Sequence, residues 1–320
     1  MPLDAARLKV VDKLLTGNTA ADDPAIKEDV DFVVSEMAKE LGADHPLSKD
    51  RAALQHFCVA RKLNMIEARK MIDAHMAWRA ATLPVRLTPA IIAELKKGKI
   101  EPYGKDVDGR PIIIVRSGRF DPKERDLDVA VASMLYLLEK TASEYPSSTK
   151  VIIFYDRQGF SFRKNWDFDF LKAVAGVLSD NYPEKLAGAY IYPASAILGG
   201  LWSLIKPFFE PRTRSKVRAG YSVQASAQRA RRRAPIASHS LLSCVADALV
   251  CCARCLLRGV LVPQVRIITS DKELLTLIPS EYVPTHAGGT STHTFDPSMY
   301  DALQSEVEGG ATGTDAVPIS

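Results

Sequence analysis

The chain has 320 residues, of which 47% are hydrophobic and 25% charged, an ordinary balance for a folded globular protein. Its formal net charge of +4 is local, because six arginines and a single aspartate lie between residues 219 and 264. The near-neutral remainder argues against nucleic-acid binding. The sequence contains neither an uncharged apolar run of about 18 residues nor an apolar stretch near its start. We therefore expect a cytoplasmic protein that meets membranes only at their surface.

Residues 1–85 are predicted to form a helical region. Apolar residues recur at helical spacing over 29–41, and that run ends before Gly42. Ser48-Lys49-Asp50 and Asn64 are suited to cap two further helices, and Pro84 follows the end of the second. Such a short bundle is expected to pack against the rest of the chain.

From about residue 100, apolar runs of strand length alternate with helical spacing. Val107-Asp108-Gly109-Arg110 is a turn signal. Strands are predicted at 111–115, 151–155, 187–192 and 265–269, and helices at 129–143, 168–178 and 271–277. This alternation predicts an α/β fold with a sheet covered on at least one face, over residues 86–295. Residues 296–320 are predicted to be a disordered tail.

Several segments resemble the CRAL-TRIO family, which includes phosphatidylinositol-transfer proteins. They are LQHFCVARKLNMIEARKMIDAHMAWR (54–79), KDVDGRPIIIV (105–115), DNYPEKLAGAYIYPA (180–194), IKPFFEPRTRSK (205–216) and IPSEYVPTHAGGT (278–290). The resemblance implies an N-terminal helical bundle, a mixed or largely parallel sheet with covering helices, and an apolar cavity that holds one lipid.

The resemblance also implies a site for the lipid headgroup. Family members that bind phosphatidylinositol place an Arg, a Glu, a Thr and a Lys there, and the matching positions here are Arg61, Glu184, Thr213 and Lys216, with Lys62 as a fifth candidate. Cations and a hydroxyl suit a phosphate taken out of water, and a carboxylate can accept hydrogen bonds from inositol. Taken singly, each residue also has an ordinary structural interpretation, such as a helix-terminal charge at Glu184.

Residues 193–211 are predicted to include a gate helix over the cavity mouth, as the resemblance implies. Gly199-Gly200 could act as its hinge, and a plain buried helix is the alternative. Where relatives that also carry phosphatidylcholine have hydroxyl side chains, this chain has the apolar Val151 and Ile153. The second ligand is therefore expected to be a sterol, an isoprenoid or none. The predicted gate residues are Ile197, Leu198, Leu201, Trp202, Leu204, Ile205, Phe208 and Phe209.

One segment interrupts the family pattern. Removing the 48 residues Val217–Gln264 joins RTRSK directly to VRIITSDKELL, and the dipeptide Val-Arg occurs on both sides of the join. Every valine codon begins with GT, and a CAG codon for Gln264 would end in AG, so we interpret the segment as a translated, unspliced intron. A lineage-specific loop is the alternative. Four of the five cysteines lie in this segment, in a pattern that does not match a zinc site.

These observations predict a protein that binds phosphatidylinositol and transfers or presents it between membranes. The alternative ligands are tocopherol, a retinoid, a sterol or an isoprenoid, and a phosphoinositide kinase is an alternative partner. Catalytic motifs such as GxSxG and GxxxxGK[ST] do not occur in the sequence, so we expect no enzyme activity, no cofactor, no metal and no nucleic-acid partner.

Overall fold

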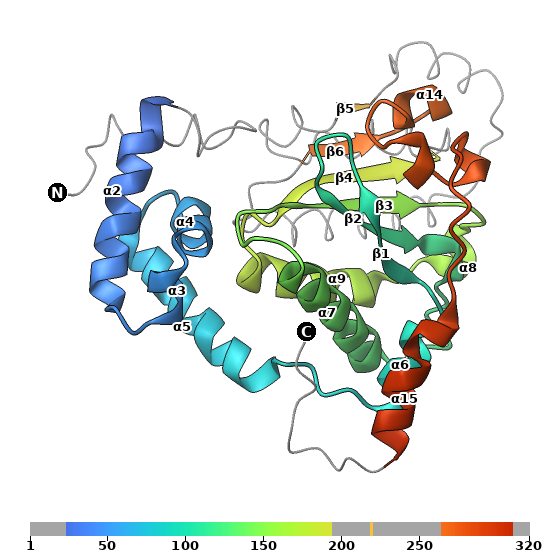
Figure 1. Cartoon of the computed structure of the whole chain (residues 1–320), viewed down its shortest axis with the longest axis horizontal. Helices are drawn as coiled ribbons and strands as arrows, with labels where there is room; N and C mark the ends of the chain where they lie inside the picture. The colour runs from blue at the N-terminus through green and yellow to red at the C-terminus, as the bar shows by residue number, and fades with distance from the viewer. Residues whose placement is uncertain (1–23, 194–217, 220–263, 310–320) are drawn as a thin grey trace, which may run out of the picture.

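The computed structural model describes residues 24–193, 218–219 and 264–309. A small helical bundle lies beside a larger domain in which helices cover a sheet (Figure 1). The bundle and its connection to the domain comprise α2 (Pro24–Leu41), α3 (Pro46–Lys49), α4 (Arg51–Ala60), α5 (Met65–Thr82) and α6 (Pro89–Leu95). The helices of the domain are α7 (Leu127–Ser143), α8 (Phe162–Asn165), α9 (Phe168–Asn181), α14 (Asp271–Leu274) and α15 (Asp301–Glu308), with short 3-10 turns η2 (Ser117–Arg119), η4 (Ser280–Tyr282), η5 (Thr285–Ala287) and η6 (Pro297–Tyr300).

The sheet has six strands in the order β1-β2-β3-β4-β6-β5. The first pair is antiparallel and the other pairs are parallel, so the predicted mixed, largely parallel sheet is confirmed. The parallel direction places the start of β3 and the start of β4 at one edge of the sheet and their ends at the other. The strands are β1 (Ile100–Lys105), β2 (Pro111–Arg116), β3 (Val151–Asp156), β4 (Leu186–Tyr192), β5 (Arg218–Ala219) and β6 (Gln264–Ile267).

Each face of the sheet has its own apolar core. Alternate residues of a strand point to opposite faces, so Ile152 and Phe154 of β3 contribute to one core, with Leu274, Ile278 and Val283 from the C-terminal segment. The opposite face is covered by α7 and α9 (Figure 1), whose buried side chains include Met134, Leu135 and Phe170. Fully burying one such side chain stabilises the fold by about 1.5–3 kcal/mol, so these two cores hold the layers together.

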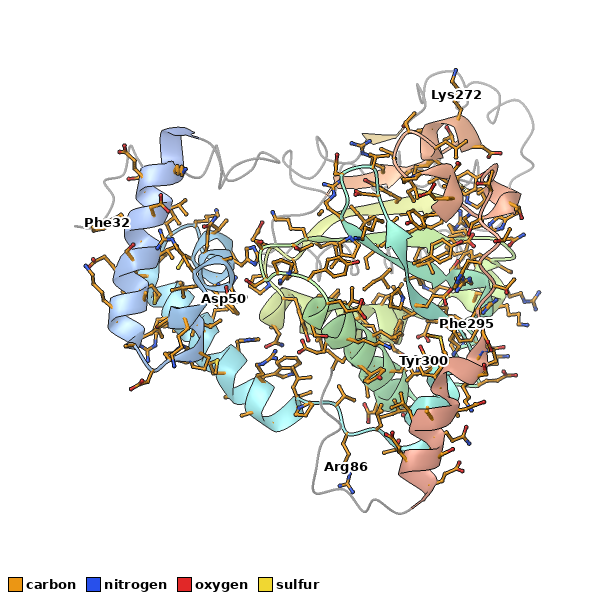
Figure 2. The ribbon with its side chains drawn as sticks, in the orientation of Figure 1. Phe32, Asp50, Arg86, Lys272, Phe295 and Tyr300 are labelled. Atoms are coloured by element: carbon orange, nitrogen blue, oxygen red, sulfur yellow. The ribbon has the colours of Figure 1, made fainter. Side chains whose placement is uncertain are left out.

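The bundle forms for the reasons that its sequence indicates. Oδ1 of Asp50 accepts a hydrogen bond from the Ala53 amide at 2.9 Å and caps α4. Oδ1 of Asn64 accepts from the Glu67 amide at 3.1 Å and caps α5. The bundle has an apolar core that includes Met37, Leu54, Phe57 and Ile72. Figure 2 shows Asp50 on the side of the bundle that faces the sheet.

The predicted disordered tail is wrong over residues 296–309. Oδ1 of Asp296 accepts from the Ser298 amide and caps η6, and α15 follows directly. Tyr300 is 1% exposed and packs with Ile92 and Leu137, while Lys96 Nζ lies 2.7 Å from Asp301. Figure 2 labels Tyr300 and Phe295 where this segment returns to the domain. Tyr300, with the partly buried Leu303 and Val307, anchors a stretch whose polar composition suggested disorder.

The other predicted helices and strands within the described residues are confirmed within a few residues, whereas α3, α6, α8, β1 and β5 had no separate prediction. The predicted gate helix lies outside the described residues. Within the described ranges, none of the helices is both long enough and apolar enough to cross a membrane.

Candidate functional site

The starts of β3 and β4 bring two lysines to the same edge of the sheet. Lys150 directly precedes β3 and Lys185 directly precedes β4, and the Val151 amide donates to the Lys185 carbonyl at 2.8 Å. Helix α4 of the bundle faces this edge (Figure 1). We call this the bundle-side edge, defined by Lys150, Glu184, Lys185 and the α4 residue His56.

Glu184 is enclosed at the bundle-side edge. Its side chain is 12% exposed, its Oε1 is buried, and its Oε2 lies 3.9 Å from Lys150 Nζ. The residue lies in the loop between α9 and β4, so its interpretation as a helix N-terminal charge is wrong. A carboxylate in such a place has lost much of its water and gains from cations and hydrogen-bond donors.

A hydrogen-bonded network fixes the neighbouring lysine. Lys185 Nζ donates to the Ser147 carbonyl, and the Ser147 hydroxyl donates to Asp50 Oδ1 at 2.7 Å. Burial lowers the pKa of Lys185. Burial works to raise the pKa of Asp50, but hydrogen bonds from the Ala53 amide and the Ser147 hydroxyl lower it overall. The network therefore joins the cap of α4 to the start of β4.

His56 carries no charge at this edge at neutral pH. Burial, followed by the positive charges of Lys185 and Lys150, lowers the pKa of His56 to about 4. Burial alone would keep the imidazole neutral, but the charges of Lys185 and Lys150 lower its pKa further and outweigh the opposing charge of Asp50, so positive charge predominates around it. Such a site favours an anion.

Two predicted headgroup residues have a strained backbone. Among the described residues, φ is positive at three that are not glycine, namely Lys62 (54°), Leu63 (61°) and Glu184 (57°). Left-handed backbone costs about 1–2 kcal/mol for an ordinary L-residue and concentrates at functional sites. The strain thus coincides with Lys62 and Glu184, which were selected from the sequence on other grounds.

Arg61 takes the position at which α4 ends. Its amide donates to the Phe57 carbonyl, and its charge helps to lower the pKa of the exposed Glu67, after the Lys70 hydrogen bond and charge. Asp50 and His56 place the first part of α4 at the edge that holds Glu184, and the structure describes Arg61 beside Glu67. Thr213, Lys216 and the predicted gate residues 197–209 lie outside the described residues, as does the cavity wall that they would form.

A second group of contacts fixes the bundle against the domain. Arg79 Nη2 of α5 lies 3.1 Å from Glu139 Oε2 of α7, and the Tyr182 hydroxyl donates to Glu139 Oε1 at 2.6 Å. His75 Nδ1 lies 3.3 Å from Asn181 Oδ1. The polar contacts of α5 with α7 and α9 therefore hold α4 in place over the bundle-side edge.

The sheet beyond this edge presents a half-buried apolar surface. Ile153 and Tyr155 of β3 point to the same face as Val115, on the side of α7 and α9, and pair with Ala189 and Ile191 of β4. All four are half-buried, in contrast to the fully buried residues between them. The apolar surface begins beside Glu184, since Val151 pairs with Leu186 two residues further on.

The sequence-based reasoning missed three residues of this site, His56, Lys150 and Lys185. A signal for the lysines was present, because each is the residue before a predicted parallel strand, and starts of adjacent parallel strands lie at one edge. His56 had no comparable signal, because it reaches the edge through the packing of the bundle.

Comparison with known proteins identifies the class to which this fold belongs. Residues 95–224 match the family model described as the CRAL/TRIO domain. The chain therefore contains a region similar to the CRAL/TRIO domain.

Individual relatives are distant. A CRAL-TRIO domain-containing protein of Schizosaccharomyces pombe is 28% identical over 200 residues, which are 58% of this chain and 56% of that protein. The phosphatidylinositol/phosphatidylcholine transfer protein SFH9 of Arabidopsis thaliana is 27% identical over 194 residues, 54% of this chain and 33% of that protein. The crystal structure of Sfh5 aligns with a TM-score of 0.42 and 20% identity, covering 67% of this chain and 80% of that one. The chain thus matches about half or less of these curated relatives' length.

Proposed function

We propose that the chain binds phosphatidylinositol, with the headgroup at the bundle-side edge and the acyl chains along the half-buried face of β3 and β4, and that it transfers or presents this lipid at membranes. The observation that carries the proposal is Glu184, an enclosed carboxylate in a left-handed conformation, 3.9 Å from Lys150. Its oxygens accept hydrogen bonds from inositol hydroxyls, while Lys150 and Lys185 attract the phosphate.

The family resemblance supplies the rest of the proposed site. Arg61 and Lys62 follow α4, and Lys216 lies two residues before β5 in the chain, with Thr213 shortly ahead of it. In the proposal Lys216 and Thr213 contact the phosphate, and the predicted gate helix covers the acyl chains. The apolar Val151 and Ile153 support a second ligand without a choline headgroup, such as a sterol or an isoprenoid.

The decisive variant is Glu184→Asn. Asparagine tolerates a left-handed backbone, so the substitution removes the charge and leaves the conformation. We expect the dissociation constant for short-chain phosphatidylinositol, measured in solution by calorimetry, to rise about tenfold or more, because a hydrogen bond to a charged group contributes about 1.5–3 kcal/mol. The matched control is Glu124→Gln, at an exposed carboxylate, which should bind as the parent does.

Equal binding by the parent and Glu184→Asn would contradict the proposed headgroup site, provided that both unfold at similar temperatures. Mass spectrometry of the lipid that co-purifies with the protein tests the ligand itself. Recovery of only a neutral isoprenoid, sterol, retinoid or tocopherol would replace phosphatidylinositol by that ligand.

We further infer that residues 217–264 are absent from the functional chain. In the sheet, Arg218 of β5 pairs with Arg266 of β6 and Ala219 pairs with Ile267, an offset equal to the 48 residues of the segment. Joining Lys216 to Val265 would put Lys216 in the place of Gln264, opposite Gly188 of β4, and would retain Val265–Ile267 of β6. Sequencing of cDNA across the join tests this inference, and transcripts that all contain the 48 codons would refute it.

A further inference from the structure

Three aromatic rings in mutual contact form a row after the end of β3. The centroids of Phe160 and Phe162 lie 5.0 Å apart, and those of Phe162 and Trp166 lie 5.5 Å apart. The guanidinium of Arg157 lies over both phenylalanine rings, 4.9 Å from the centroid of Phe160 and 5.9 Å from that of Phe162. All three aromatic side chains are half-buried, so each keeps part of its surface in water. We call these four residues the aromatic row.

Hydrogen bonds of Asn165 hold the segment that carries the aromatic row. Asn165, which is 4% exposed, accepts a hydrogen bond from the Ser161 amide at 2.7 Å and donates to the carbonyls of Gly118 and Phe120. These bonds hold α8 against η2, at the opposite end of β3 from the bundle-side edge (Figure 1). The rings are therefore presented by a rigid turn at the periphery of the domain.

Positive charge surrounds the aromatic row. Arg163 and Lys164 are exposed, and neither forms an ion pair within the described part of the chain. The nearest acids in sequence differ in access, since Asp167 is 5% exposed and paired with Arg125, whereas Asp169 is 74% exposed. With Arg157 included, three cations stand against one accessible carboxylate.

We propose that the aromatic row, together with Arg163 and Lys164, is the surface with which this protein docks on membranes that contain anionic lipids. Phenylalanine and tryptophan suit the boundary between headgroups and acyl chains, and cations beside them are attracted to an anionic leaflet. Arg157 Nη1 also donates to the Pro193 carbonyl at 3.2 Å, directly before the segment that the sequence predicts to be the gate. Docking here would bring lipid exchange to the membrane surface.

Ring geometry favours a membrane over a single-stranded nucleic acid as the partner. Bases stack on open aromatic faces. Here Phe160 and Phe162 meet edge to face at 79°, Phe162 and Trp166 are tilted by 39°, and Arg157 lies over both phenylalanine rings. Outward ring edges insert into a lipid interface without needing an open face. The near-neutral charge outside residues 219–264 points the same way.

The charge part of the proposal is tested by sedimentation with vesicles of phosphatidylcholine, with and without phosphatidylserine. The double variant Arg163→Glu/Lys164→Glu should lose about tenfold or more in its partition onto the anionic vesicles, since each cation near such a surface contributes about 1 kcal/mol. The matched control is Lys49→Glu/Arg86→Glu, which changes the net charge equally at exposed positions of the bundle and the linker. Equal loss in both variants would overturn the proposal, because it would reflect net charge alone.

The fluorescence of Trp166 reports membrane contact at the aromatic row itself, which the charge variants cannot do. In a Trp78→Phe/Trp202→Phe background, Trp166 is the single tryptophan, and its emission should shift to shorter wavelength when anionic vesicles are added. Vesicle binding without such a shift would overturn the proposal by placing contact elsewhere. Binding of a single-stranded oligonucleotide as tightly as the anionic vesicles would overturn it in favour of that partner.

This inference rests on the proposed function, because it assumes that the protein meets membranes. Separate experiments can contradict the headgroup site and the docking surface. Short-chain phosphatidylinositol binds from solution and needs no docking, so the charge-reversed variant should retain its affinity for that lipid. Glu184→Asn should sediment with anionic vesicles as the parent does. Loss of both properties in either variant would show that the two surfaces are not independent and would overturn the docking assignment.

Discussion

The two ends of the parallel strands are closed in different ways. At the bundle-side edge, a separate group of helices covers the starts of β3 and β4 through charged and titratable side chains, including His56, Lys150 and Lys185. At the other edge, the C-terminal segment folds tightly back, with His286 Nε2 3.3 Å from Asp156 Oδ1 and the Tyr192 hydroxyl bonded to Asp271. The second edge also contains ionisable groups, but its segment is held by backbone turns, in which the Ala287 amide donates to the Pro284 carbonyl and the Ser291 amide to the Val283 carbonyl. We therefore expect the bundle-side edge to respond to pH and anions, and the other edge to respond to changes in side-chain size.

The largest expected effect breaks the tightly folded edge. In Gly289→Ala, the new Cβ would lie 1.9 Å from the Val283 carbonyl oxygen, so the backbone has to move. We expect the free energy of unfolding, measured with urea, to fall by about 3 kcal/mol or more. Gly109→Ala is the control, because its φ of +78° strains an alanine but a Cβ there meets nothing within 4 Å, so it reports backbone strain without a clash. A loss no greater than that of Gly109→Ala would contradict this description of the edge.

The next largest effect is a loss of stability at the bundle-side edge when the pH is lowered. The pKa of His56 falls from 6.5 to about 4 on folding, so the unfolded chain binds more protons between these values. The stability that this residue contributes is fully present above pH 6.5 and is lost as the pH falls toward 4. The total loss is at most about 3 kcal/mol.

Urea titrations across that pH range test the assignment. His56→Gln should flatten the slope of unfolding free energy against pH, whereas Ser147→Ala, which removes the hydroxyl bonded to Asp50, should lower stability without flattening it. A slope that persists in His56→Gln would assign the titration to another residue. Loading with phosphatidylinositol should reduce the slope, because a nearby anion raises the pKa of His56.

The smallest effect comes from relieving backbone strain just after α4, the helix that faces the bundle-side edge. Lys62 has a φ of 54° and is exposed, so Lys62→Gly should raise the free energy of unfolding by about 0.5–1 kcal/mol, after the greater freedom of glycine in the unfolded chain is counted. Leu63→Gly is the contrasting variant. Its φ is 61°, but the side chain is 4% exposed, and lost burial should make it destabilising. A destabilised Lys62→Gly would show that the lysine side chain supports the loop.

Much of the fold follows from local signals in the sequence. Asp50 and Asn64 were identified as caps because their side chains satisfy free amides at helix starts, and both do so. Strands such as Val151–Asp156 were recognised from uninterrupted apolar runs. Strand β1 lacked such a run, since IEPYGK is half polar, and its buried Glu101 is held by Arg116 from the neighbouring strand. A pairing between strands cannot be read from either segment alone.

The candidate site also combines residues that local motifs predict with residues that only tertiary packing brings in. Glu184, Arg61 and Lys62 were predicted through motif resemblance, but Lys150, the cation 3.9 Å from Glu184, comes from a position distant in sequence. His56 titrates unusually only because α4 faces the sheet, and no local pattern encodes that packing. Tyr300 was missed because one aromatic residue in a polar stretch gives no periodicity, although its burial orders the segment around it.

The pairing of β5 with β6 has a consequence for self-association. While β5 is present, β6 has neighbours on both sides. A chain without residues 217–264 would leave β6 outermost, with its outer N–H and C=O groups open to another copy. The strand in that chain would begin with Lys216 in place of Gln264, and lysine on an outermost strand opposes edge-to-edge pairing. The same residue proposed to contact the phosphate would thereby keep the shorter chain monomeric.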